Sequence, residues 1–157
     1  MVRLHSATST TDLEHIRKLF REYADALGVN LDYQGFEDEL RDLPGSYASP
    51  AGTLVLARKE NDVLGCVGVR PIDARTAEMK RLYVRPSGRG LGLGRTLAEA
   101  AIRFATVSGY ERMRLDTLPQ MDRAQELYRS LGFMPIDAYR FSPVPGTVFL
   151  ELVLTSG

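Results

Sequence analysis

Apolar residues recur at two different spacings along the chain, and each spacing predicts a kind of element. Between residues 13 and 27 they stand three or four positions apart, which predicts an amphipathic helix ending near Gly28. The segment "TDLE" at its start has the pattern of a capping box, with Thr11 as the N-cap and Glu14 returning to it. A second, shorter helix is predicted over residues 36–43, before the turn-rich loop "LPGSYASPAG".

Runs rich in β-branched and other apolar residues predict strands after this loop. A short alternating segment, "VRLHSA", comes before the first helix, and the predicted strands are "TLVLARK", "VLGCVGVRP", "TAEMKRLYV", "RMRLDTL" and "GTVFLELVL". Two further helices separate the last three strands. One ends at Ser108 and Gly109, and the other covers "DRAQELYRSLG". This order predicts an α/β (α+β) protein with a mixed sheet and helices on both of its faces.

Length and composition indicate one soluble globular domain. With 157 residues, the chain can bury one sizeable core but not two, so we expect a single domain over residues 1–157. Its twenty basic and twenty acidic residues balance, which argues against nucleic acid as a partner and requires any anion site to be local. No apolar run approaches the roughly 18 residues of a membrane span, so we expect no membrane association and a cytoplasmic protein.

The single cysteine, Cys66, lies in the apolar run "DVLGCVGV". One cysteine excludes an internal disulfide and a thiolate-rich metal cluster, and no metal is expected. A buried structural role is favoured over a catalytic thiol, because no histidine lies nearby in the sequence.

The segment "EMKRLYVRPSGRGLGLGRTL" places three glycines at alternate positions between two arginines, after a strand and before a helix. Gly90, Gly92 and Gly94 let the backbone curl so that its amide N–H groups face one small space. The first amides of the helix and the positive end of its dipole face the same space. Arg89 and Arg95 add guanidinium donors, so the segment predicts a diphosphate cradle.

The spacing of these glycines does not fit the two commonest nucleotide-binding loops. In the dinucleotide fingerprint, the third glycine would fall at Arg95. The phosphate loop of nucleoside triphosphatases needs Gly-Lys-Ser or Gly-Lys-Thr, which this chain lacks. A nucleotide-dependent dehydrogenase or kinase is therefore disfavoured.

The pattern Arg/Gln-x-x-Gly-x-Gly/Ala is present as Arg89, Gly92 and Gly94, after "V-x-P" at the end of a strand. A later segment, "AQELYRSLGF", has a tyrosine on a short helix. In both motifs the chain resembles the GCN5-related N-acetyltransferases (GNAT family). The resemblance covers nearly the whole chain. It implies acetyl-CoA as the co-substrate and a mixed, mostly antiparallel central sheet of six to seven strands, with helices on both faces.

The resemblance also implies where acyl-CoA binds. The pantetheine arm would lie between the strands that end at Val84 and near Thr117, which splay apart. It would pair with exposed backbone groups along the first strand, one of which would polarise the thioester carbonyl. Met121 stands where many family members have an asparagine, and Thr117 is a candidate to replace that contact. The residues expected to bind the cofactor are Leu82, Tyr83, Val84, Arg89, Gly90, Leu91, Gly92, Leu93, Gly94, Arg95 and Thr117.

Two residues are candidates for the chemistry. Glu78 is the candidate base for the acceptor amine, directly or through water, because strand alternation puts it on the same side as Val84 if no bulge intervenes. The alternative is a solvated carboxylate or a partner for Lys80 or Arg81. Tyr128 is the candidate acid for the departing thiolate, and the alternative is a tyrosine that covers a helix face.

The acceptor is expected to be a small amine-bearing molecule. Proline and aromatic residues in "LPGSYASPAG" and "DAYRFSPVPG" suit the walls of a compact pocket, and the chain has no acidic run to receive a lysine-rich tail. The alternative function is a catalytically weak acyl-CoA binding or sensing module, and association into a homodimer is left open. Aromatic residues that could line the pocket, although each could instead belong to the core, are Phe20, Tyr23, Tyr33, Phe36 and Tyr139.

Overall fold

A seven-stranded sheet runs through the part of the chain that the structure describes. This computed structural model describes residues 1–28, 30–31 and 35–154. The strands are β1 (Val2–Ser6), β2 (Thr53–Lys59), β3 (Asp62–Pro71), β4 (Thr76–Val84), β5 (Arg112–Thr117), β6 (Met134–Pro135) and β7 (Val148–Val153). The helices are α1 (Thr10–Leu27), α2 (Phe36–Asp42), α3 (Leu93–Val107) and α4 (Asp122–Ser130), with short 3-10 turns η2 (Gly45–Tyr47) and η3 (Pro86–Gly88).

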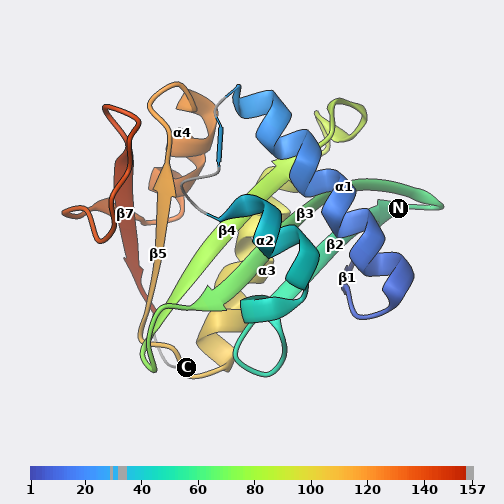
Figure 1. The fold of residues 1–157 in the computed structure, drawn as a ribbon, viewed down its shortest axis with the longest axis horizontal. Coiled ribbons are helices and arrows are strands. Elements are labelled where there is room, and N and C mark those ends of the chain that lie inside the picture. Colours follow the sequence, from blue (N-terminus) through green and yellow to red (C-terminus); the bar gives the residue numbers. More distant parts are fainter. Residues whose placement is uncertain (29, 32–34, 155–157) are drawn as a thin grey trace.

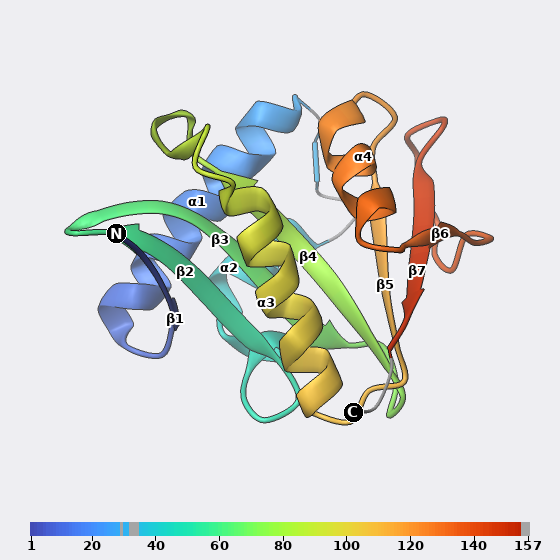
Figure 2. The same ribbon diagram turned by 180° about the vertical axis from the view of Figure 1, so that it is seen from behind.

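The strand order is β1-β2-β3-β4-β5-β7-β6, and every neighbouring pair is antiparallel except β4 and β5. The prediction of a mixed, mostly antiparallel sheet with helices is therefore confirmed. The parallel pair is short: Thr76–Glu78 of β4 pairs with Arg112–Arg114 of β5. Beyond it the two strands diverge (Figures 1 and 2), as the resemblance implied.

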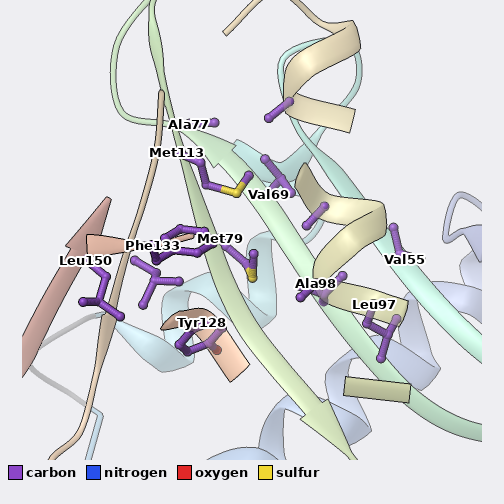
Figure 3. Packing of buried hydrophobic residues seen from close by; sticks show 14 of the residues in the cluster. Val55, Val69, Ala77, Met79, Leu97, Ala98, Met113, Tyr128, Phe133 and Leu150 are labelled. Atoms are coloured by element: carbon purple, nitrogen blue, oxygen red, sulfur yellow. The ribbon is translucent and has the colours of Figure 1, made fainter. Parts of the chain in front are cut away.

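Helices cover both faces of the sheet. On one face, α3 and α4 lie over the strands (Figure 2) and close a core that includes Leu97, Ala101, Met113 and Leu150. Figure 3 shows part of this core. On the other face, α1 and α2 pack on a second cluster (Figure 1), which contains Cys66. None of the helices in the described residues is long and apolar enough to span a membrane.

The first helix begins two residues earlier than the capping box predicted. Ser9 is the N-cap, and its side chain accepts a hydrogen bond from the backbone N–H of Asp12 at 3.0 Å. Thr11 is inside the helix, so its prediction as the N-cap is wrong. Ser9, Thr10 and Thr11 are adjacent and all have side chains that can cap a helix, so the sequence did not distinguish them. The predicted end is confirmed, because Gly28 caps the helix in the left-handed conformation.

A β-bulge interrupts β4 at Arg81, which has a φ of 59°. The register with β3 shifts there, because Lys80 pairs with Gly68 whereas Tyr83 pairs with Cys66. The bulge reverses the alternation of the strand, so Leu82 and Val84 pack toward the α3 face while Glu78 lies on the opposite face. The condition that no bulge intervenes is therefore not met, and Glu78 and Val84 do not share one side.

Candidate active site

A cleft opens where β4 and β5 part. One wall comes from the bulged part of β4, and the other comes from the end of β5 and from α4. Helix α1 and the segment after it cover one side. The lining residues are Tyr23, Leu27, Leu31, Met79, Lys80, Arg81, Leu82, Asp116, Thr117, Leu118, Met121, Tyr128 and Thr147.

The glycine loop brings the N-terminus of α3 to the end of β4 and beside α4 (Figure 2). Gly92 caps the helix with a φ of 71°, and Gly90 has a φ of 84°. Side chains at these positions would be strained, whereas the space in front of both α-carbons is open. The unpaired amides of the first turn, from Leu93 to Arg95, therefore begin a fifteen-residue helix at an accessible position.

The side chains of this loop differ in how firmly they are held. Arg95 donates a hydrogen bond to Ser130 Oγ on α4 at 2.6 Å and lies 3.9 Å from a carboxylate oxygen of Glu99. Arg89 and Leu91 are exposed, whereas Leu93 is buried in the core. Leu93 could therefore contribute only its backbone to a ligand.

Gly94 differs from the other two glycines of the loop. It lies inside the first turn of α3, and a Cβ there would meet Leu127 of α4 in ordinary contact at 3.6 Å. The lack of a side chain at Gly94 would let a ligand approach the backbone closely, and no unusual backbone conformation requires glycine there.

Tyr128 lines the cleft from α4 and packs edge-on against Phe133, with 5.8 Å between the ring centroids. Its side chain belongs to the core shown in Figure 3. Burial raises the pKa of Tyr128, and electrostatic interactions with Tyr23 and Asp116 raise it further. The phenol therefore keeps its proton at neutral pH and is available as a hydrogen-bond donor.

Glu78 is completely buried and makes three polar contacts. Its Oε1 accepts a hydrogen bond from Arg70 Nε at 2.9 Å. Its Oε2 accepts one from the Tyr139 hydroxyl at 2.6 Å and pairs with Arg140 at 2.6 Å. Burial raises the pKa of this carboxyl, but Lys80, the arginines and the Tyr139 hydrogen bond outweigh it and lower the pKa below its usual value.

An ion pair spans the cleft where the strands part. The ammonium of Lys80 on β4 lies 3.7 Å from Asp116 Oδ1 on β5. Burial lowers the pKa of Lys80 to about 8, although the nearby carboxylates of Asp116 and Glu78 oppose that shift. This lysine therefore loses its proton more readily than an exposed lysine does.

The aromatic residues expected around the acceptor lie in several environments. Tyr23 lines the cleft. Phe20 is fully buried against Tyr47 in the second core, and Phe36 is buried beneath the guanidinium of Arg81 at 5.2 Å. Tyr139 binds Glu78, and Tyr33 lies outside the described residues.

The two residues considered for the missing asparagine contact are in the cleft. Thr117 and Met121 both line it, and the Thr117 hydroxyl donates to the Met121 sulfur at 3.7 Å. Thr117 is thus positioned where the sequence placed it, at the inner end of β5.

Sequence reasoning named Arg140, with Tyr139, as a residue that could reach the acceptor, but it assigned no site role to Lys80, Asp116 or Arg70. One signal was available: charged residues alternate with apolar ones in "TAEMKRLYV" and "RMRLDT". Such alternation on two adjacent, otherwise buried strands indicates a polar face. The partner of each charge depends on the bulge and on contacts between distant segments, which the alternation cannot supply.

The sheet, the parted strands and the glycine loop together define an acyl-CoA N-acyltransferase fold. A crystal structure of an acetyltransferase from Streptococcus agalactiae 2603 superposes with a TM-score of 0.79 at 21% identity, over 98% of each chain. A Salmonella typhimurium acetyltransferase structure, solved with its cofactor acetyl-CoA, superposes with a TM-score of 0.69 at 22% identity. That match covers 99% of this chain and 95% of the other.

Sequence comparison extends this similarity from fold to family. The model of the Acetyltransferase (GNAT) family matches residues 13–133. An uncharacterized N-acetyltransferase of Schizosaccharomyces pombe is 39% identical over 146 residues, covering 92% of this chain and 90% of that protein. The chain therefore belongs to the GNAT family of acetyl-CoA-dependent N-acetyltransferases.

Proposed function

We propose that the protein transfers the acetyl group of acetyl-CoA to the primary amine of a small molecule, by direct attack within a ternary complex. The observation that carries this proposal is the cleft between β4 and β5. A buried tyrosine of α4 lies on one wall and a backbone edge of β4 on the other, and α3 begins beside α4. These are the parts that thioester aminolysis needs: a proton donor, oxyanion donors and a diphosphate site.

Several residues of this chain suit the coenzyme. The amides at the start of α3, with Gly90 and Gly92 in left-handed conformations, suit a diphosphate, and Arg89 and Arg95 add positive charge. Beyond the short parallel pairing, the edge of β4 at Leu82–Val84 is no longer bonded to β5, so its backbone groups suit the amides of pantetheine. Thr117 faces them from the other wall.

The proton donor for the leaving thiolate is Tyr128 in this proposal. As the amine nitrogen bonds to the carbonyl carbon and the carbon–sulfur bond breaks, the phenol proton moves to the sulfur. The high pKa of Tyr128 keeps that proton in place before the reaction. It also makes the transfer uphill, so Tyr128 must lie in contact with the sulfur for the proton to move as charge develops there.

Glu78 is the proposed destination of the amine proton. Both of its oxygens already accept hydrogen bonds or ion pairs, so we propose that it acts through an intervening water rather than by direct contact with the amine. Because its pKa is lowered, the carboxylate form persists to acidic pH. An acidic limb caused by Glu78 therefore belongs below pH 4.5, the ordinary value for this group.

A compact acceptor is supported by what surrounds the polar face of β4. Helix α2 approaches it through the ion pair between Glu39 and Arg81, and the connection from β6 to β7 approaches through Tyr139 and Arg140. Because both segments contact β4, the space beside its polar face is enclosed from two sides. An enclosed space suits a small ligand better than an extended peptide.

The test is a screen of small amines and of short peptides with acetyl-CoA, read as release of free thiol. We expect turnover of small amines at millimolar concentration. Turnover of peptides alone would overturn the small-acceptor proposal while leaving acetyl transfer in place. Tight acetyl-CoA binding without turnover of any amine would favour the alternative, a weakly catalytic acyl-CoA binding module.

A further inference from the structure

Three arginines and two glutamates form one connected cluster across α2, β3, β4 and the β6–β7 connection. Arg81 donates to both oxygens of Glu39, at 3.1 and 3.2 Å. Arg70 joins Glu39 to Glu78, lying 3.8 Å from the first and 2.9 Å from the second. Arg140 completes the chain through its ion pair with Glu78 at 2.6 Å. Within the described residues the cluster therefore carries one positive charge more than its carboxylates neutralise.

This excess charge lies in a largely buried place. Both glutamates and Arg81 expose a tenth or less of their side chains, and Arg70 and Arg140 expose about a quarter. An uncompensated charge away from water is unfavourable, so an anion brought to the cluster would gain from it. The lowered pKa of fully buried Glu78 is consistent with a positive local field.

The cluster adjoins the cleft. Arg81 lines the cleft directly, and Thr147, from the same connection as Arg140, lines it as well. Asp116, another lining residue, is close enough for its charge to act on Arg140. A ligand that enters the cleft from the polar face of β4 therefore meets the positive cluster.

Arg140 is the member of the cluster best able to bind a ligand. A guanidinium has five N–H donors, and the 2.6 Å contact of Arg140 with Glu78 is made by one nitrogen. The Cζ atom of Arg140 lies 4.9 Å from the centroid of the Tyr139 ring. Arg81, in contrast, directs two nitrogens to Glu39 and stacks on Phe36. Arg140 therefore has N–H donors left for a bidentate contact with a ligand, whereas Arg81 already directs such a pair of donors to Glu39.

We infer that the acceptor is an amino acid or a close analogue, whose carboxylate is bound by Arg140 while its amine enters the cleft. This inference rests on the proposed function, and it names the substrate class and a specificity-determining residue. A carboxylate beside the amine matches the planar fork of a guanidinium and neutralises the extra charge of the cluster.

The experiment compares the twenty protein amino acids with their α-carboxamides, in the presence of acetyl-CoA, by thiol release. The amine of a carboxamide is less basic and so more often unprotonated, which favours the amide chemically; a preference for the acid must therefore come from binding. We expect at least one acid whose kcat/KM exceeds that of its amide by about 10- to 100-fold, the range of a charge-assisted hydrogen bond. In Arg140→Gln this ratio should fall toward one, with the KM for acetyl-CoA unchanged.

Arg114 supplies a matched control. Its exposed fraction is 27%, against 26% for Arg140, and its guanidinium lies 5.6 Å from the same Tyr139 ring. It differs in having a carboxylate of its own, because its Nε donates to Glu151 at 2.8 Å. Arg114→Gln should therefore keep the preference for the acid. Arg140→Lys, which keeps the charge but not the fork, should recover part of it.

Calorimetric binding of the same acids to the CoA complex separates this inference from the proposed function. Binding that depends on Arg140 without turnover would support the anion site and overturn the transferase proposal. Turnover in which amides equal acids would leave the transferase proposal and overturn the inference. Equal losses in Arg114→Gln and Arg140→Gln would overturn the assignment to Arg140.

Discussion

Two ionisable side chains near the cleft are moved in opposite directions by their surroundings. Tyr128 is buried among apolar groups, so its pKa rises and the neutral phenol is favoured. Glu78 is equally buried but is surrounded by cations, so its pKa falls and the carboxylate is favoured. A protonated donor and an ionised acceptor at neutral pH are the forms that amine acetylation requires of an acid and a base.

Replacing Tyr128 by Phe tests the acid. The change removes the proposed proton donor and keeps the packed ring. We therefore expect kcat to fall by about 10² or more with little change in coenzyme binding. Steady-state kinetics and calorimetry with coenzyme A would measure the two effects. Tyr110→Phe is the control, since that hydroxyl donates to Ala51 O away from the cleft, and it should leave kcat unchanged. An unaltered rate in Tyr128→Phe would remove Tyr128 from the mechanism.

Replacing Glu78 by Gln has a consequence for stability as well as for rate. At neutral pH the variant leaves Arg140 without its carboxylate and Arg70 with only the more distant Glu39, so the free energy of unfolding should fall by about 1.5 to 3 kcal/mol. The pKa of Glu78 in the folded state is below the ordinary 4.5, so this contribution is complete above that pH. It is lost as the pH falls below 4.5 through the lowered pKa.

Urea unfolding from pH 7 to pH 3 would measure this difference between wild type and Glu78→Gln. Glu111→Gln, which breaks the exposed pair with Arg75, is the control and should change stability by less than about 0.5 kcal/mol. A difference that stays constant over the whole range would show that the carboxylate charge is not responsible. In activity, an acidic limb above pH 4.5 that persists in Glu78→Gln belongs to another group or to the acceptor.

At the scale of elements, two local irregularities shape the site. The bulge at Arg81 turns Leu82 and Val84 away from the face that holds Glu78, so β4 presents charged groups before the bulge and a different set of side chains after it. The left-handed glycines then allow α3 to begin directly beside α4. The proposed coenzyme site therefore relies on these backbone conformations, in addition to the side chains proposed above.

Gly92→Val tests this dependence on the backbone. A side chain there would occupy the open space in front of the first amides of α3, so we expect the dissociation constant for coenzyme A to rise at least tenfold, or about 1.4 kcal/mol. Gly109→Val is the matched control, because Gly109 has a φ of 91° at the other end of the same helix. Both variants should lose similar stability. Tight binding by folded Gly92→Val would show that the cradle is misplaced.

At the scale of the whole molecule, β4 and β5 join two halves of the sheet through three paired residues on each strand and the Lys80–Asp116 ion pair. A ligand seated between the strands would add contacts to both halves. Since only the folded protein offers that cleft, binding should raise the stability of the entire chain.

Acetyl-CoA at 100 times its dissociation constant should therefore stabilise the protein by about 2.7 kcal/mol. For a chain of this size, that corresponds to an increase in Tm of roughly 5 to 10 °C. A thermal shift assay would measure it, with NAD and ATP at the same concentration as controls. An equal shift with either nucleotide would contradict specific recognition of coenzyme A.

The sequence determined most of the elements and indicated the family. Strands β2 and β4 have the predicted bounds, and the end of α1 lies at Gly28, because alternation, helical spacing and glycine act over a few neighbouring residues. The motif at Arg89, Gly92 and Gly94 likewise indicated the family, since its residues are close together in the chain. The two-residue strand β6 is too short to leave such a signal.

Only the tertiary structure determined which charged side chains form ion pairs with one another. The sequence put Glu78 and Val84 on the same side of the strand if no bulge intervened, and the bulge at Arg81 puts them on opposite sides. It also offered no means of pairing Glu78 with Arg140, 62 positions later, or Lys80 with Asp116. These contacts follow from the register of the sheet and from the path of the β6–β7 connection. Burial and charge, which set the pKa values of the site, are properties of that arrangement and not of any single segment.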